Sequence, residues 1–132
     1  MANAWRQQVG SDPAWRRAVL VPVPLHPARR RRRGFDQTAW LATGLGERLG
    51  LEVRLGALAR TRPTLPQGDP RVQSRAANVE GAFAVGRPGG VAGRHLILVD
   101  DVFTSGATAR ACAGVLREAG GVAVAVLTAC RS

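Results

Sequence analysis

The chain has 132 residues, of which 45% are hydrophobic and 21% charged, and this size and composition fit one globular domain with a modest core. All 19 basic residues are arginine, and the sequence contains no lysine and no tyrosine. P-loop proteins and Schiff-base enzymes are therefore excluded, because both need a lysine amine. Nine acidic residues leave a formal net charge of +10, so nucleic acids or phosphorylated metabolites are the expected partners.

Cysteine content and hydropathy predict the compartment. Cys112 and Cys130 are too few for a disulfide framework and lack the spacing of a zinc site, so we expect two buried core thiols in a reducing environment. The first ten residues are polar, and the longest apolar run, residues 122–127, is too short to cross a bilayer. We therefore expect a cytoplasmic protein without a membrane partner.

The first half of the chain predicts a strand, a helix and a second strand. Residues 18–24 form an apolar run closed by prolines, which is typical of a buried strand that leads into a rigid loop. Leucines at four-residue spacing then predict an amphipathic helix, with Asp36 as its cap and Gly50 just after its end. Residues 51–55 alternate like a strand. Three aromatic side chains are expected to pack in or against the core, namely Trp5, Trp15 and Trp40.

A long loop separates two short extended segments, residues 57–60 and 81–85. About twenty residues lie between them, and they include three prolines and a glycine. Loops of this length in compact domains are usually functional or disordered, so we expect a flexible lid. We divide the chain into an N-terminal extension, residues 1–17, and one domain, residues 18–132.

The last third of the chain predicts a βαβ unit. Residues 95–99 are a continuous apolar strand, and residues 122–128 form the final strand. The helix between them ends at a glycine pair. Strands that alternate with helices at this spacing predict an α/β fold with a mostly parallel sheet flanked by helices. The apolar face of the helix is expected to consist of Cys112, Val115, Leu116 and Ala119.

The residues that carry chemistry follow the strand at 95–99. Asp100 and Asp101 come where a parallel strand reaches the carboxyl edge of its sheet, which is where ligands of open α/β folds bind. Backbone N–H groups at the start of the next helix can hold a phosphate there. Carboxylates beside a phosphate cradle suit a ribose 5-phosphate. The cradle residues are Thr104, Ser105, Gly106, Ala107 and Thr108.

This segment resembles the phosphoribosyl pyrophosphate signature of type I phosphoribosyltransferases, in which four apolar residues, two acidic residues and a Thr/Ser-Gly-Ala/Gly-Thr loop occur in this order. The resemblance implies a type I phosphoribosyltransferase-like fold and transfer of a phosphoribosyl group with release of pyrophosphate. It also implies that Asp100 and Asp101 are the catalytic residues and bind the ribose. Mg²⁺ would be bound through the substrate and not by a dedicated protein site.

Further segments resemble the ComF family of competence-associated phosphoribosyltransferase-like proteins. The resemblance implies a link to DNA uptake, with single-stranded DNA and competence or DNA-processing proteins as partners. Many members begin with a cysteine-rich zinc-binding segment, which this chain lacks, so we expect a shortened member. The segments are VPVPLH at 21–26, RGFDQ at 33–37, Arg60, Thr61, Arg62, Thr64, Gln67, Arg75 and NVEGAF at 78–83.

Several alternatives stay open. The acidic strand also resembles a Walker B strand, although no P-loop sequence accompanies it, or a receiver-like acidic cluster, which leaves the hydroxyl-rich loop unexplained. The arginine run at residues 29–33 fits a pyrophosphate site, a nucleic-acid contact or a solvated surface. Arg33, Arg71 and Arg75 are the candidate pyrophosphate or lid residues. The fold also allows a non-catalytic accessory protein that binds single-stranded DNA.

Overall fold

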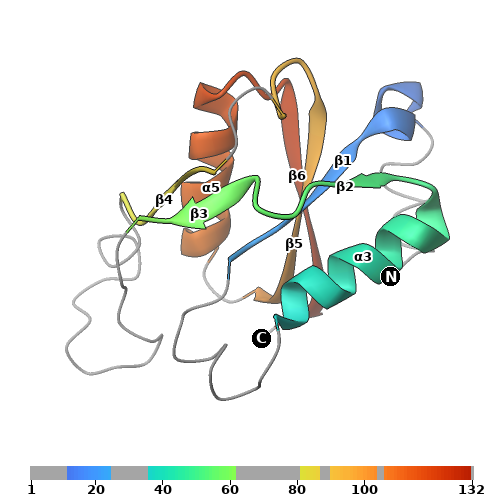
Figure 1. The fold of residues 1–132 in the computed structure, drawn as a ribbon, viewed down its shortest axis with the longest axis horizontal. Helices are drawn as coiled ribbons and strands as arrows, with labels where there is room; N and C mark the ends of the chain where they lie inside the picture. Colours follow the sequence, from blue (N-terminus) through green and yellow to red (C-terminus); the bar gives the residue numbers. More distant parts are fainter. Residues whose placement is uncertain (1–11, 25–35, 62–80, 87–89, 104–105, 132) are drawn as a thin grey trace.

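The structure is a computed structural model that describes residues 12–24, 36–61, 81–86, 90–103 and 106–131. It confirms the predicted α/β architecture (Figure 1). The elements in chain order are the 3₁₀ helix η1 (Pro13–Arg17), β1 (Val19–Pro22), α3 (Gln37–Leu49), β2 (Glu52–Val53), β3 (Leu58–Arg60), β4 (Phe83–Val85), β5 (His95–Phe103), α5 (Ala107–Glu118) and β6 (Ala123–Arg131).

Four strands form a parallel sheet in the order β2-β1-β5-β6. β5 is paired on both sides, with β1 as far as Pro22↔Val99 and with β6 as far as Phe103↔Arg131. The pairing with β1 ends at Val99, where one further bond runs from Val23 N to Val99 O at 2.9 Å. The far end of β5 therefore projects beyond β1. β3 and β4 form a separate antiparallel pair.

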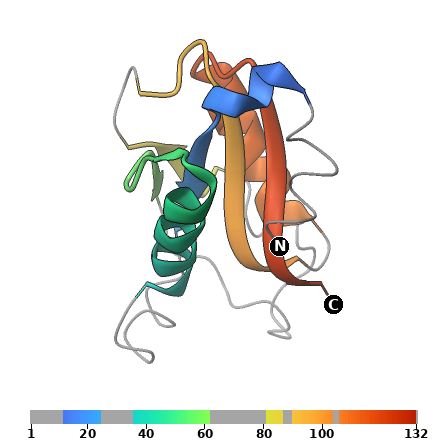
Figure 2. The ribbon, with the colours of Figure 1, turned by 90° about the vertical axis from the view of Figure 1, so that its right-hand side faces the viewer.

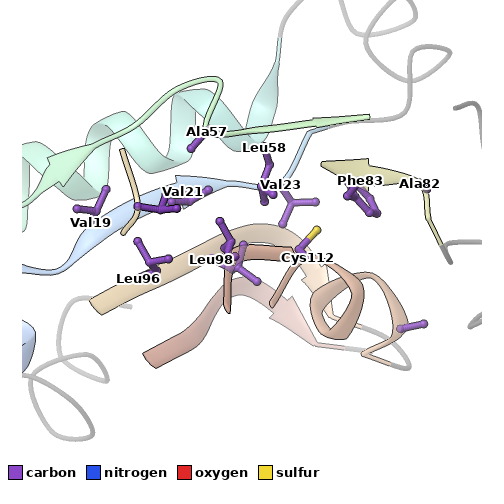
Figure 3. Packing of buried hydrophobic residues seen from close by; sticks show 13 residues of the cluster. Val19, Val21, Val23, Ala57, Leu58, Ala82, Phe83, Leu96, Leu98 and Cys112 are labelled. Atoms are coloured by element: carbon purple, nitrogen blue, oxygen red, sulfur yellow. The ribbon is translucent and has the colours of Figure 1, made fainter. Parts of the chain in front are cut away.

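The alternation of side chains along β5 divides the core into two layers. Leu96 and Leu98 pack on one face with α5, β3 and β4, whereas Ile97 and Val99 pack on the other face with α3. Figure 2 shows the two helices on opposite sides of the sheet. Figure 3 shows the first layer, in which Cys112 of α5 lies among side chains of β1, β4 and β5. Both faces of β5 are thus covered, as a continuous apolar strand requires.

Helix α3 begins and ends where its sequence predicts. The side chain of Asp36 accepts a hydrogen bond from Ala39 N at 3.1 Å, and Gly50 adopts a left-handed conformation at the other end. Trp40, however, is 70% exposed, so the prediction that it packs against the core is wrong. The buried stripe of α3 consists of Thr38, Ala42, Leu45 and Gly46, and this phase turns position 40 outward.

The other sequence predictions are confirmed in part. Trp15 packs edge-on against His95 with 4.9 Å between ring centroids, and Cys112 is buried, both as predicted. The strand expected at residues 51–55 is shorter, and β5 and β6 are both longer than expected, because each extends the other's ladder. Trp5 and the predicted lid lie outside the described residues. The boundary at residue 17 stays a prediction.

The described helices are short. α3 has 13 residues and α5 has 12, and a membrane-spanning helix needs about 20, so neither can cross a bilayer.

Candidate functional site

The two consecutive carboxylates lie on the part of β5 that extends beyond β1. The sequence predicts that the strand ends at Asp100 and Asp101, but in the structure it continues to Phe103. β6 keeps the strand extended, with Asp100 opposite Thr128 and the ladder continuing past it. The two aspartates therefore belong to a paired strand at the carboxyl edge of the sheet. Ligands of open α/β sheets bind at this edge.

Strand geometry directs the two carboxylates to opposite faces. By alternation Asp100 shares the face of Leu96 and Leu98, which α5 covers, and Asp101 shares the face of Ile97 and Val99. Asp101 N donates a hydrogen bond to Asp100 Oδ1 at 2.8 Å, so the Asp100 carboxylate bends along its own strand. Asp101 is 8% exposed and Asp100 is more accessible. The acidic pair thus has an inner and an outer member.

An arginine that the sequence does not identify as a site residue lies on the α5 side of the sheet, against Phe83. Arg60, at the end of β3, donates from Nε to Pro24 O at 3.1 Å, and its guanidinium carbon lies 4.9 Å from the centre of the Phe83 ring. These two contacts fix the guanidinium beside the end of β1. The only sequence signal is its place just before the long loop, within a segment of the family resemblance.

The pKa of the Cys112 thiol reports the electrostatics of this face. Burial, the largest cause, and the negative charge of Asp100 together raise this pKa to about 12, and the positive charge of Arg60 opposes the rise. Both charges therefore act on one buried thiol from the α5 side of the sheet. Asp100 and Arg60, 40 residues apart in sequence, are brought to the same region of the fold.

Helix α5 begins at this edge with a glycine. Gly106 is the N-cap, with φ of +81°, a backbone conformation that side chains rarely adopt. Ala107 is buried and Thr108 is half-buried in the first turn. The positive end of the helix dipole lies at this first turn, as a phosphate cradle requires. Thr104 and Ser105 lie outside the described residues, as do Arg33, Arg71 and Arg75.

A metal site built from protein side chains alone needs several ligands in one place among the described residues. Among them no three His, Cys, Asp or Glu side chains come together as a ligand group. The donors at the edge are the two aspartate carboxylates of β5, which are hard oxygen ligands. A Mg²⁺ ion held by one or two carboxylates together with substrate phosphates fits such a donor set.

Comparison with curated proteins shows what the chain is related to. It is 38% identical over 113 residues to the DNA utilization protein YhgH of Escherichia coli K12, a match that covers 86% of this chain and 49% of that protein. It is 30% identical over 103 residues to Competence protein F of Haemophilus influenzae, covering 77% of this chain and 45% of that one. The chain thus spans about half the length of these relatives. No protein-family model matches it.

Solved structures give the same fold. The glutamine phosphoribosylpyrophosphate amidotransferase of B. subtilis, determined with ADP and GMP, aligns with a TM-score of 0.56 and 27% identity over 85% of this chain and 22% of that chain. A hypoxanthine phosphoribosyltransferase of Staphylococcus aureus aligns with a TM-score of 0.53 at 12% identity, over 95% of this chain and 58% of the other.

These relatives confirm both resemblances that the sequence indicates. The chain has the type I phosphoribosyltransferase fold, and it is a relative of the competence-associated ComF proteins.

Proposed function

We propose that this chain binds phosphoribosyl pyrophosphate together with Mg²⁺ and transfers the phosphoribosyl group to an acceptor, with release of pyrophosphate. The observation that carries the proposal is the arrangement at the carboxyl edge. There the end of β5 presents Asp100, the glycine-capped start of α5 follows, and Arg60 lies on the same side of the sheet. A ribose that bears a phosphate and a pyrophosphate requires three things of its site. These are acceptors for its hydroxyls, a helix dipole for the phosphate and a fixed cation for the pyrophosphate.

Each part has a distinct role in the proposal. Asp100 accepts hydrogen bonds from the ribose hydroxyls, and Asp101 holds Asp100 in place through its backbone N–H and adds negative charge beneath the sugar. The 5-phosphate lies on the backbone of residues 104–108, and Arg60 neutralises the pyrophosphate. When bound, Mg²⁺ supplies charge to the pyrophosphate oxygens. The chain's contribution is thus positioning and charge neutralisation as the bond at the anomeric carbon breaks.

Calorimetric titration with phosphoribosyl pyrophosphate, with and without MgCl₂, tests the binding step. We expect magnesium-dependent binding that Asp100→Asn weakens strongly. Glu118→Gln, which removes the same charge from an exposed position in the last turn of α5, is the matched control and should bind normally. Equal affinity of both variants, with both folded, would show that Asp100 does not contact the ligand.

Arg60 is tested by a substitution that keeps its charge. Lysine has no Nε–H fork, so Arg60→Lys loses the bond to Pro24 O and the planar contact with Phe83. We expect weaker binding of phosphoribosyl pyrophosphate but unchanged binding of ribose 5-phosphate, which lacks the pyrophosphate. Arg54→Lys, at an exposed ion pair with Glu52, is the control and should alter neither.

Transfer is tested by pyrophosphate release in the presence of a panel of purine and pyrimidine bases and amines. A second candidate function remains if binding occurs without turnover. The names of the relatives refer to DNA utilization and competence, and the net charge of +10 suits a polyanion. In that case the chain is an accessory protein that binds single-stranded DNA.

Salt separates the two candidates. Contacts to a nucleic-acid backbone release counterions, so affinity for single-stranded DNA should fall about tenfold or more between 50 and 200 mM salt if several arginines take part. Replacing Arg30, Arg31 and Arg32 by serine should reduce that dependence and leave phosphoribosyl pyrophosphate binding intact. Loss of both activities would place the arginines at the ligand site, and no DNA binding at low salt would exclude the accessory role.

A further inference from the structure

The two edges of the parallel sheet differ in length and in charge. At one edge β2 has two residues, and its Glu52 forms ion pairs with Arg54 at 2.8 Å and with Arg94 at 2.9 Å. At the other edge β6 has nine residues, and positions 122–130 include no charged residue and no proline. Proteins usually protect open edges with short strands, charges or prolines. β2 has this protection, whereas β6 carries a charge only at its last residue, Arg131.

The outer side of β6 presents a row of backbone hydrogen-bonding groups. Val122 N donates inward to Arg94 O at 2.9 Å, and successive residues of a strand direct their backbone groups to opposite sides. The N–H and C=O groups of residues 123, 125, 127 and 129 therefore point away from β5. Within the described part of the chain, β6 is the last strand of its sheet, and Figure 2 shows it at the margin away from α3.

Apolar side chains accompany this row. Val126 is 40% exposed and Val122 is 61% exposed, whereas Leu96 and Leu98 of the neighbouring strand are completely buried. β6 is a long strand whose one charged residue is its last, Arg131, and it has an exposed valine and outward N–H and C=O groups. Such a strand is a template for pairing with another strand.

We propose that β6 pairs with the β6 strand of a second copy of this chain, antiparallel about a two-fold axis at Val126. Charge favours this occupant over other self-contacts. Two copies of a chain with net charge +10 repel each other where their arginines meet, and β6 is a long exposed stretch on which like charges do not face each other. Exposed arginines are present on the other elements at Arg16, Arg17, Arg48, Arg110 and Arg117.

The register follows from the outward groups. With the axis at Val126, residue 125 faces residue 127 of the second copy and residue 123 faces residue 129, so all outward groups form hydrogen-bonded pairs. Val126 then faces its own copy in a close, non-hydrogen-bonded pair, where its exposed side chain becomes covered. The two four-stranded sheets become one continuous sheet.

Sedimentation equilibrium of the full chain tests this pairing. We expect a species of twice the 13.9 kDa chain mass at micromolar concentrations, and its dissociation constant should fall as salt rises, because screening weakens the repulsion between the cationic chains. Val126→Lys places two like charges opposite each other and should raise that constant about tenfold or more. Leu55→Lys, at a 53% exposed position beside β2, is the matched control and should change it less than about twofold.

A cross-link tests the register. Opposed residues in a non-hydrogen-bonded pair have Cα atoms about 4.5 Å apart, which a disulfide can span. In a Cys130→Ser background, Val126→Cys should give a covalent dimer on mild oxidation and Leu55→Cys should not. A chain that stays monomeric at about 100 µM overturns the proposal. So does a dimer that Val126→Lys leaves intact, or one that disappears after nuclease treatment.

Discussion

The two helices begin at the same edge of the sheet, and they begin differently. The start of α3 is capped by its own sequence, since the Asp36 carboxylate accepts from Ala39 N and Thr38 Oγ1 lies 2.8 Å from Val23 O, just after β1. The start of α5 has Gly106, which has no side chain with which to cap a helix. Asp36 also places a negative charge at its helix start, which would repel a phosphate.

At this edge of the sheet, the start of α3 therefore serves the stability of the fold, whereas the start of α5 serves ligand binding. The capped end of α3 attaches the helix to β1, whereas the glycine at α5 allows a ligand to approach the backbone closely. Substitutions near α3 should therefore change stability and leave ligand binding intact. Substitutions near α5 should change binding more than stability.

The largest effect is expected for Asp100→Asn combined with Asp101→Asn, on the strand that leads to α5. Loss of the Asp100 carboxylate removes charge-assisted hydrogen bonds to the ribose hydroxyls worth about 1.5–3 kcal/mol each, and loss of Asp101 removes the negative charge beside them. Affinity for phosphoribosyl pyrophosphate should therefore fall about a hundredfold or more. The melting temperature should hardly change, because Leu96, Ile97, Leu98 and Val99 hold the strand in the core. Calorimetry and thermal unfolding measure the two quantities. Unchanged affinity in the folded variant would contradict the site.

Gly106→Ala tests the start of α5 itself. An alanine at positive φ costs about 1–2 kcal/mol, and a shift of the backbone to relieve it should move the phosphate cradle and weaken binding about tenfold. Gly50→Ala, at the end of α3 with φ of +67°, meets nothing within 4 Å and is the control. It should lose similar stability and no affinity. Equal loss of affinity in both variants would mean that general destabilisation is responsible.

Asp36→Ala addresses the capped helix. Loss of an N-cap side chain typically costs about 1 kcal/mol, and Thr38 Oγ1 also loses a neighbour 2.8 Å away. Urea unfolding should therefore show a lower midpoint, while phosphoribosyl pyrophosphate binds to the folded variant with the original affinity. Asp36→Asn keeps a capping oxygen and should restore most of the stability. A loss of affinity in Asp36→Ala would indicate that α3 contributes to the ligand site.

Some features of the fold and of the site can be predicted from the sequence and others cannot, because some depend on neighbouring residues and others on contacts between distant parts of the chain. Asp36, Gly50 and the apolar run of β5 are local signals, so both ends of α3 and the central strand can be predicted directly. The extension of β5 to Phe103 depends on pairing with β6. Arg60 is held at the site by contacts with residues far away in sequence, such as its bond to Pro24, 36 residues away, and no local pattern indicates such a contact.

The exposure of Trp40 shows how far a local pattern can mislead. Its size and its place beside the leucine stripe suggest packing, but the phase of α3 is set by the contact of Gly46 with the sheet. A Cβ at that position would overlap the side chain of Val53 and lie 2.9 Å from Leu51 O. The close approach of helix and strand thus fixes which residues of α3 face outward.

Gly44 and Gly46 give the finest comparison, because they lie two residues apart on α3. A Cβ at Gly44 meets nothing within 4 Å, so Gly44→Ala should stabilise the protein by about 0.5–1 kcal/mol through a more ordered helix. Gly46→Ala should instead destabilise it by about 1–3 kcal/mol, because the added methyl group separates α3 from β2. Urea unfolding at matched conditions measures both changes. Both substitutions introduce the same helix propensity, so opposite signs of the two stability changes isolate the packing of α3 on the sheet. A gain of stability in both variants would contradict the close approach of α3 to the sheet at Gly46, where a Cβ would lie 2.9 Å from Leu51 O.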